Sequence, residues 1–189
     1  MLIASQNLSN HNVNLPQDTI YRINLAWIDD LESLKKILEK HKEHKIFLDL
    51  PKNRTKPPNN KYSMNELQPF LQSFQNIKYF AISNIDSAGD LSPFLDYLSD
   101  DMIVVPKIES PDGVKNIAEI VKLLGPEKIV LLDHDDLYSS ILKLGDDPNN
   151  FQVYVKSLID FCDKNDVTIL RTIGVIFGDT EKRISEYIK

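Results

Sequence analysis

The stretch MIVVPKIE, residues 102–109, has the composition of a buried β-strand that ends in a lysine and a glutamate. Side chains two residues apart in a strand lie on the same face, so Lys107 and Glu109 share one face at its C-terminal end. Residues 110–113, Ser-Pro-Asp-Gly, then lead into apolar residues at helical spacing over 114–124. A parallel strand that ends in charged groups and turns into a helix is how α/β folds present their chemistry. On this stretch alone, a solvated lysine and glutamate at a strand end is an equally good interpretation.

The rest of the chain repeats this arrangement of a strand followed by a helical pattern. Strand composition is also found at residues 1–5, 19–25, 45–50, 77–82, 128–132 and 167–170. Strands that are apolar throughout and alternate with helices predict a parallel sheet covered on both faces. We therefore predict an α/β fold of the (β/α) TIM-barrel type, compact and incomplete, with seven recognisable strands in one domain over residues 1–189. An open doubly wound sheet is the alternative, although no glycine-rich phosphate loop follows any strand.

Polar or charged residues stand at the ends of the predicted strands at intervals of 24 to 36 residues. They are Arg22, Asp49, Ser83, Lys107 with Glu109, Asp136 and Thr172. Each interval corresponds to one strand and one helix, and this regular unit favours the barrel over the open sheet. Because parallel strands bring their C-terminal ends to one edge of the sheet, we expect these side chains to converge.

Composition and charge exclude several classes of protein. The apolar fraction of 42% and the charged fraction of 26% are those of an ordinary globular domain. The formal net charge is -6 and the isoelectric point about 5.2, so nucleic acid is not an expected partner. No 18 apolar residues run together and the N-terminus lacks the features of a signal peptide, so we expect a cytoplasmic protein without a membrane partner. The single cysteine, Cys162, lies in a helical apolar pattern and is interpreted as buried filler rather than a nucleophile.

Residues 106–121, PKIESPDGVKNIAEIV, resemble the Lys-Ile-Glu strand and the following helix of the pyruvate kinase family. Other short motifs of this chain also resemble motifs of that family, and they occur along the chain in the family's order. They are Arg22-Ile23-Asn24, Leu48-Asp49-Leu50-Pro51, Ala81-Ile82-Ser83, Ser87-Ala88 with Asp90-Leu91, Asp135-Asp136-Leu137 and Thr172. The wider phosphoenolpyruvate/pyruvate barrels, which include the HpcH-type aldolases and the citrate lyase β subunits, share a glutamate and aspartate metal pair.

The resemblance implies a metal site and a set of residues around it. Glu109 and Asp136 would together hold Mg2+ or Mn2+, ions that prefer carboxylate oxygens and stabilise the enolate of pyruvate. Lys107 would be a catalytic residue that adds positive charge beside the enolate oxygen. Arg22 would hold a phosphate or carboxylate group, and Thr172 would position a substrate or a water. The residues assigned to substrate binding are Arg22, Asn24, Asp49 and Ser83.

Several of these residues have an alternative structural role that the sequence leaves open. Asp136 can cap a helix that begins near Leu137, and Arg22 can form an inward ion pair with Asp49. His134 lies in an Asp-His-Asp-Asp run and is interpreted as a surface-loop histidine, with a third metal ligand or an acid–base group as the alternative. The acidic neighbours of His134 would favour a positive charge on it.

The departures from the pyruvate kinase pattern bear on the reaction. Where that family inserts a lid domain, this chain has the short basic loop 52–61. Its Lys52, Arg54 and Lys56 either gather an anionic substrate or are simply solvated. No counterpart of the C-terminal regulatory domain is recognisable, and without a lid to fold over a nucleotide, ADP phosphorylation is not expected. Asp135 stands where the family has a glycine before the metal-binding aspartate.

The sequence therefore predicts a divalent-metal-dependent enzyme that acts on phosphoenolpyruvate, pyruvate or a related 2-oxo acid through an enolate. Carbon–carbon lyase or aldolase chemistry and phosphoryl or enolpyruvyl transfer both stay open. The alternative is a catalytically degenerate barrel that binds a ligand or a partner protein, because an unclosed sheet leaves an edge that a partner or a second copy would cover. The presence of Lys107, Glu109 and Asp136 together favours the enzyme.

Overall fold

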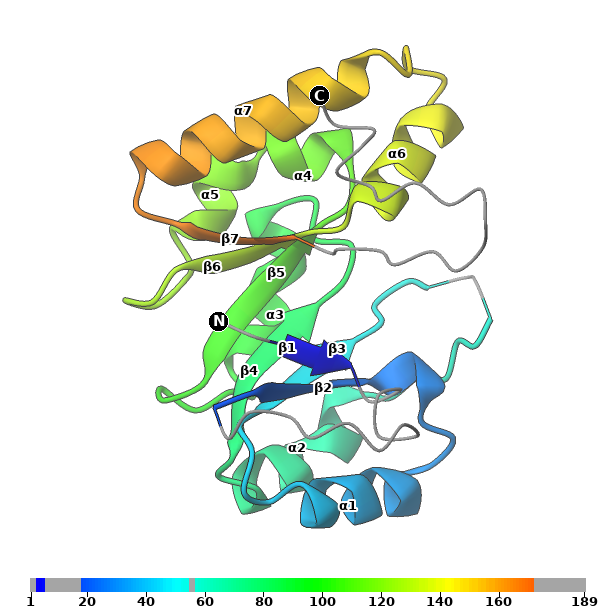
Figure 1. Ribbon diagram of the computed structural model, residues 1–189, viewed down its shortest axis with the longest axis vertical. Coiled ribbons are helices and arrows are strands. Elements are labelled where there is room, and N and C mark those ends of the chain that lie inside the picture. Colours follow the sequence, from blue (N-terminus) through cyan, green and yellow to red (C-terminus); the bar gives the residue numbers. More distant parts are fainter. Residues whose placement is uncertain (1–2, 6–17, 55–56, 172–189) are drawn as a thin grey trace.

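Seven parallel strands form one sheet in the computed structural model, which describes residues 3–5, 18–54 and 57–171 (Figure 1). Their order across the sheet is their order along the chain. The strands are β1 (Ile3–Ser5), β2 (Ile20–Asn24), β3 (Ile46–Leu50), β4 (Ile77–Ile82), β5 (Ile103–Ile108), β6 (Ile129–Leu132) and β7 (Thr168–Arg171). Each lies at one of the seven stretches that the sequence predicts, so the predicted strand positions and the parallel α/β arrangement are confirmed.

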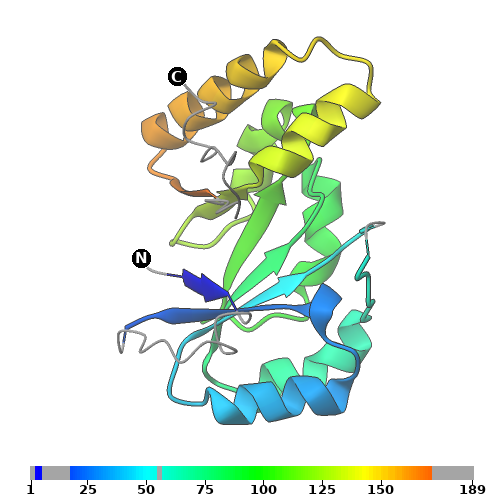
Figure 2. The same ribbon diagram turned by 45° about the vertical axis from the view of Figure 1, so that its right-hand side comes forward.

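The helices lie outside the curled sheet, on its convex face (Figures 1 and 2). They are α1 (Leu31–Lys40), α2 (Met64–Ser73), α3 (Ala88–Leu95), α4 (Pro111–Lys115), α5 (Ile117–Val121), α6 (His134–Lys143) and α7 (Asn150–Lys164), with a short 3-10 helix η2 (Leu25–Trp27). Side chains fix where several helices begin. Ser63 forms a capping box with Glu66 at α2, Ser87 caps α3 and Ser110 caps α4.

The sheet is an open, curled half-barrel, so the prediction of a TIM-type barrel is wrong (Figure 2). β1 and β7 are its two edges, and no pairing joins them within the described residues. Closure requires the strand number, tilt and stagger of the whole sheet to match, and the TIM barrel uses eight strands. The repeat of strand and helix along the sequence determines only neighbouring pairs, so it predicts parallel order without predicting closure.

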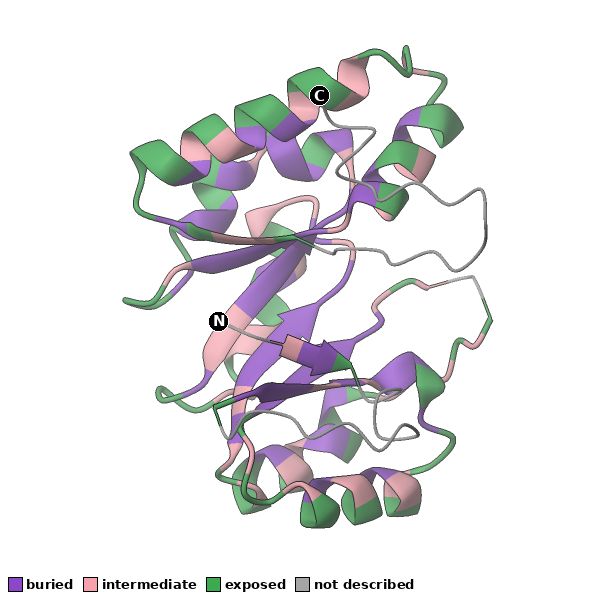
Figure 3. Cartoon of the chain, viewed as in Figure 1, coloured by how far each residue is buried: buried purple, intermediate pink, exposed green. Residues whose placement is uncertain are grey.

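The central strands of the sheet are mostly buried on both faces, and most of their length is purple in Figure 3. On the helix side, Ile23, Leu48 and Phe80 belong to the larger apolar cluster. On the concave side, Phe47 and Val105 belong to a second cluster. This burial on two faces accounts for strands that are apolar throughout. Among the described residues, no helix has the length and apolar character needed to cross a membrane.

β5 joins the two halves of the sheet. The pairing of β4 with β5 ends where Ile82 lies beside Pro106, and the pairing of β5 with β6 begins where Lys107 lies beside Leu131. Pro106 has no N–H to give to a sheet ladder. The change of partner strand therefore falls directly before Lys107.

Gly113, in α4, is expected to tolerate no side chain, because a Cβ there would lie 2.7 Å from the Ile85 carbonyl oxygen and 3.3 Å from Ile108 Cγ2. We expect Gly113→Ala to lower the free energy of unfolding by about 1–3 kcal/mol, since the backbone would have to move. Urea unfolding measures the effect. Gly125→Ala is the matched control, because a Cβ at Gly125 meets nothing within 4 Å. Equal effects of the two substitutions would contradict the close approach at Gly113.

Candidate functional site

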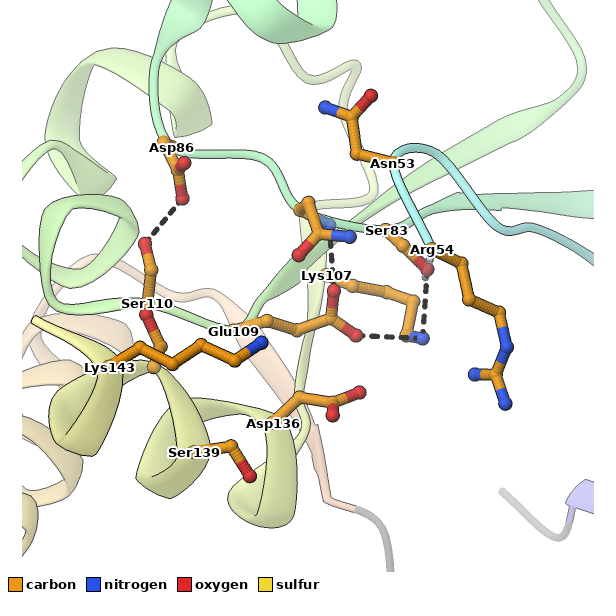
Figure 4. Close-up of a pocket in the computed structure, with 12 residues that line it drawn as sticks. Asn53, Arg54, Ser83, Asp86, Lys107, Glu109, Ser110, Asp136, Ser139 and Lys143 are labelled. Atoms are coloured by element: carbon orange, nitrogen blue, oxygen red, sulfur yellow. Dashed lines mark hydrogen bonds and ion pairs between the residues drawn. The ribbon is translucent and has the colours of Figure 1, made fainter. Parts of the chain in front are cut away.

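A pocket with a volume of about 160 Å3 lies at the C-terminal ends of the central strands (Figure 4). Its walls come from the loop after β3, the segments after β4 and β5, and one face of α6. Parallel strands bring these segments, which are far apart in the sequence, to the same edge of the sheet. The residues that line the pocket include Arg54, Ser83, Asn84, Lys107, Glu109 and Asp136.

Lys107, at the end of β5, is buried among polar partners. Its Nζ lies 2.8 Å from Glu109 Oε1 and 3.8 Å from Asp49 Oδ1, and it donates a hydrogen bond to Ser83 Oγ at 3.1 Å. Desolvation alone would lower the pKa of Lys107, but the charges of Asp49 and Glu109 raise it above its ordinary value. The ammonium is therefore charged at neutral pH. The structure thus brings together four of the predicted site residues.

Arg22 forms the inward ion pair with Asp49 that the sequence left open. Its Nε donates to Asp49 Oδ2 at 3.0 Å, and a second guanidinium nitrogen contacts the same oxygen. Asp49 is 1% exposed and serves two cations, Arg22 and Lys107. Asn24 Oδ1 accepts a hydrogen bond from the Ala26 N–H at 3.0 Å and caps η2. Neither Arg22 nor Asn24 is part of the pocket wall, so the structure does not bring these two predicted residues to it.

Glu109, Asp133 and Asp136 form a carboxylate cluster at the pocket. Each offers one oxygen, and these oxygens lie within 4.8 Å of one another. Glu109 is 3% exposed, and its Oε2 accepts a hydrogen bond from the Asn84 N–H at 2.7 Å. Burial raises the pKa of Glu109, against the lowering effect of Lys107. A divalent ion would relieve both the burial of this charge and the repulsion in the cluster, and Mg2+ and Mn2+ prefer such oxygen ligands. The residues present therefore fit a divalent ion.

Asp133 is the member of the carboxylate cluster that the sequence reasoning missed. It is the N-cap of α6, where its Oδ1 accepts a hydrogen bond from the Asp136 N–H at 3.3 Å. The helix begins at His134 rather than near Leu137, so the alternative of Asp136 as the capping residue is wrong. Two carboxylates three residues apart at a helix start lie over the same end of the helix. That spacing is the signal from which Asp133 could have been found.

His134 lies buried in the first turn of α6, so its interpretation as a surface-loop histidine is wrong. It is 3% exposed, and neither ring nitrogen has a hydrogen-bond partner in the described part of the chain. Desolvation lowers the pKa of His134 and Arg171 lowers it further, which together outweigh the opposite effect of Asp133 and Asp135. The acidic neighbours thus favour a positive charge on His134, as the sequence predicts, but burial and Arg171 have the larger effect on its pKa. His134 is not part of the pocket wall.

Two cations of the basic loop after β3, Lys52 and Arg54, have different surroundings. Lys52 Nζ lies 2.6 Å from Asp90 Oδ1 and donates to the Asn84 carbonyl oxygen at 3.3 Å, so this cation serves the fold. Arg54 lines the pocket, and its Nε donates to the Pro58 carbonyl oxygen at 2.8 Å. The interpretation of the loop lysines and arginine as simply solvated is therefore wrong for Lys52.

Two predicted residues, Lys56 and Thr172, lie outside the described residues. Cys162 is fully buried in α7, and burial raises the pKa of its thiol to about 11. The interpretation of Cys162 as buried filler is therefore confirmed.

No family model and no curated protein matches this chain. Among solved structures, the chain is similar to RipC from Yersinia pestis, with a TM-score of 0.62 and 13% sequence identity. The similarity covers 94% of this chain and 77% of RipC. At this identity the likeness shows a shared fold alone.

Proposed function

We propose that this chain is a divalent-metal-dependent enzyme that acts on phosphoenolpyruvate, pyruvate or a related 2-oxo acid through an enolate. The observation that supports the proposal is the convergence of the carboxylate cluster with the buried ammonium of Lys107. Carboxylate oxygens suit Mg2+ or Mn2+, and a fixed cation beside them suits an oxygen that gains negative charge. The resemblance of residues 106–121 to the pyruvate kinase motif leads to the same class of chemistry.

The residues have distinct roles in this proposal. Glu109, Asp133 and Asp136 hold the ion, which would supply Lewis-acid stabilisation of charge on the 2-oxo oxygen. Lys107 adds the second positive charge, and its contacts with buried carboxylates and with Ser83 hold the ammonium in place. Because its pKa is raised, Lys107 acts as a charge and not as a Schiff-base nucleophile.

The substrate in this proposal is small and anionic. The cavity of about 160 Å3 is smaller than the roughly 300–1,000 Å3 typical of pockets for drug-sized ligands, which favours a short acid over a nucleotide. Carbon–carbon bond chemistry and phosphoryl or enolpyruvyl transfer are both compatible with an enolate. The acidic composition and the single cysteine support a cytoplasmic location without a nucleic-acid partner.

Thermal unfolding with and without Mn2+ plus oxalate tests the proposal, because oxalate resembles the planar enolate of pyruvate. A ligand at 100 times its Kd adds about 2.7 kcal/mol of stability. For a chain of this size that corresponds to a rise in Tm of about 5–11 °C. An unchanged Tm at saturating Mn2+ and oxalate would count against the metal-dependent enzyme.

The alternative function is a binding module without catalysis, and the open sheet favours it. β7 is an edge strand with Thr168 and Arg171 exposed, and its outer side pairs with no described strand. A partner protein or a second copy could cover such an edge. No response to Mn2+ and oxalate, together with concentration-dependent association in sedimentation experiments, would favour the binding module.

A further inference from the structure

One face of α6 forms a pocket wall that extends away from the carboxylate cluster. Asp136, Ser139, Ser140 and Lys143 all line the pocket, and their spacing places them on the same side of the helix. Asp136 and Lys143 are seven residues apart, which is about 10 Å along the helix axis. The wall thus carries a carboxylate from the first turn of α6, two hydroxyls from its middle and a lysine from its last residue.

Lys143 is the last residue of α6, and its side chain lies along the pocket in Figure 4. Helical side chains tilt toward the N-terminus, so Lys143 extends back toward the carboxylate cluster. Its ammonium has no ion pair or hydrogen bond with any residue that the structure describes. The helix dipole favours a lysine in the last turn of any helix, and Lys164 is likewise the last residue of α7. Lys164 does not line the pocket, so only Lys143 combines this position with access to a ligand.

The chemistry of the whole wall favours a ligand that is polar at both ends. Every residue that lines the pocket carries a polar or charged side chain. An apolar tail would remove water from these groups without replacing its hydrogen bonds, which is unfavourable. Of the other two cations, Lys107 is held by buried carboxylates, and Arg54 donates its Nε to Pro58. Lys143 is thus the lining cation without a described ion pair or hydrogen bond, and it can bind a second anionic group of a ligand.

We propose that the substrate is a 2-oxo dicarboxylic acid whose second carboxylate binds Lys143. The inference rests on the proposed function, because the 2-oxo acid end is placed at the carboxylate cluster with its ion. The far carboxylate accepts hydrogen bonds from the Lys143 ammonium and the Ser140 hydroxyl. The Ser139 hydroxyl already donates to the Asp135 carbonyl oxygen at 2.7 Å, so it contributes polarity and no donor.

Isothermal titration calorimetry of the Mn2+-loaded protein with two five-carbon acids tests the inference. 2-Oxoglutarate carries the far carboxylate, and 2-oxopentanoate has the same chain without it. We expect 2-oxoglutarate to bind about tenfold more tightly, the effect of roughly one hydrogen bond to a charged group. In Lys143→Gln the ratio of the two Kd values should fall to about one. Lys164→Gln, which removes a lysine from the matching position of α7, should keep the ratio.

The possible outcomes separate this inference from the proposed function. Equal affinity for both acids in the unsubstituted protein, or a preference that persists in Lys143→Gln, would overturn the inference. Failure of both acids to bind, in a protein whose Tm still rises with Mn2+ plus oxalate, would also overturn the inference alone. Failure of both acids and of Mn2+ plus oxalate would contradict the proposed function, and the inference with it.

Discussion

Asp49→Ala is expected to lower the free energy of unfolding by about 3–5 kcal/mol, which is the usual cost of removing one partner from a buried ion pair. Asp49 lies in β3, all of whose residues are buried, and it is 1% exposed. Its two oxygens serve Arg22 on one side and Lys107 on the other. Without Asp49, the buried ammonium of Lys107 would depend on Glu109 for compensation of its charge.

Asp101→Ala is the matched control for this experiment. Asp101 also pairs with a lysine, Lys78, at 2.6 Å, but its side chain is 58% exposed. Exposed ion pairs of this kind contribute less than about 1 kcal/mol. Urea unfolding followed by circular dichroism measures both variants under the same conditions. A loss for Asp49→Ala no larger than that for Asp101→Ala would show that the buried charges compensate one another without Asp49.

Glu109→Gln is expected to remove the whole rise in Tm of about 5–11 °C that Mn2+ plus oxalate produces. The substitution replaces a charged oxygen ligand by a neutral amide, which a hard divalent ion binds poorly. The amide oxygen can still accept the hydrogen bond from the Asn84 N–H, and Lys107 keeps its contact with Asp49. The variant should therefore fold, and each protein's own metal-free Tm serves as its baseline.

Two further variants sharpen this prediction. Asp136→Asn changes a second member of the carboxylate cluster from a different element, and it should weaken the response to Mn2+ in the same way. Glu119→Gln changes an exposed glutamate in α5, away from the pocket, and should retain the full rise. A full response in Glu109→Gln would place the ion, if one binds, somewhere other than the carboxylate cluster.

The strands and the approach of Glu109 to Asp136 could be predicted because both follow from local pattern and nearest-neighbour pairing. Apolar runs bounded by turns locate each strand, and parallel order places the end of β5 beside the end of β6. A residue just after each strand therefore falls at a shared edge. The same reasoning brings Lys107 next to Ser83, at the end of the neighbouring strand β4.

The features that the sequence did not predict depend on side-chain direction or on the whole sheet. Residue type leaves open whether Arg22 turns toward a ligand or toward Asp49, and the structure shows the ion pair with Asp49. Because α6 begins at His134, Asp133 rather than Asp136 is its N-cap, and His134 lies buried in the first turn. Barrel closure depends on the combined twist of all strands, which no single repeat unit contains.

The change of partner strand at Pro106 places Lys107 and Glu109 between the two halves of the sheet. The ladder to β4 stops at Pro106 and the ladder to β6 starts at the next residue, while the Ile85 N–H still donates to the Lys107 carbonyl oxygen at 3.3 Å. Asp49 and Ser83 belong to one half, whereas Asp133 and Asp136 belong to the other. Lys107 contacts Asp49 in the first half, whereas Glu109 shares the carboxylate cluster with two aspartates of the second half, so the spacing of that cluster depends on the curvature of the sheet.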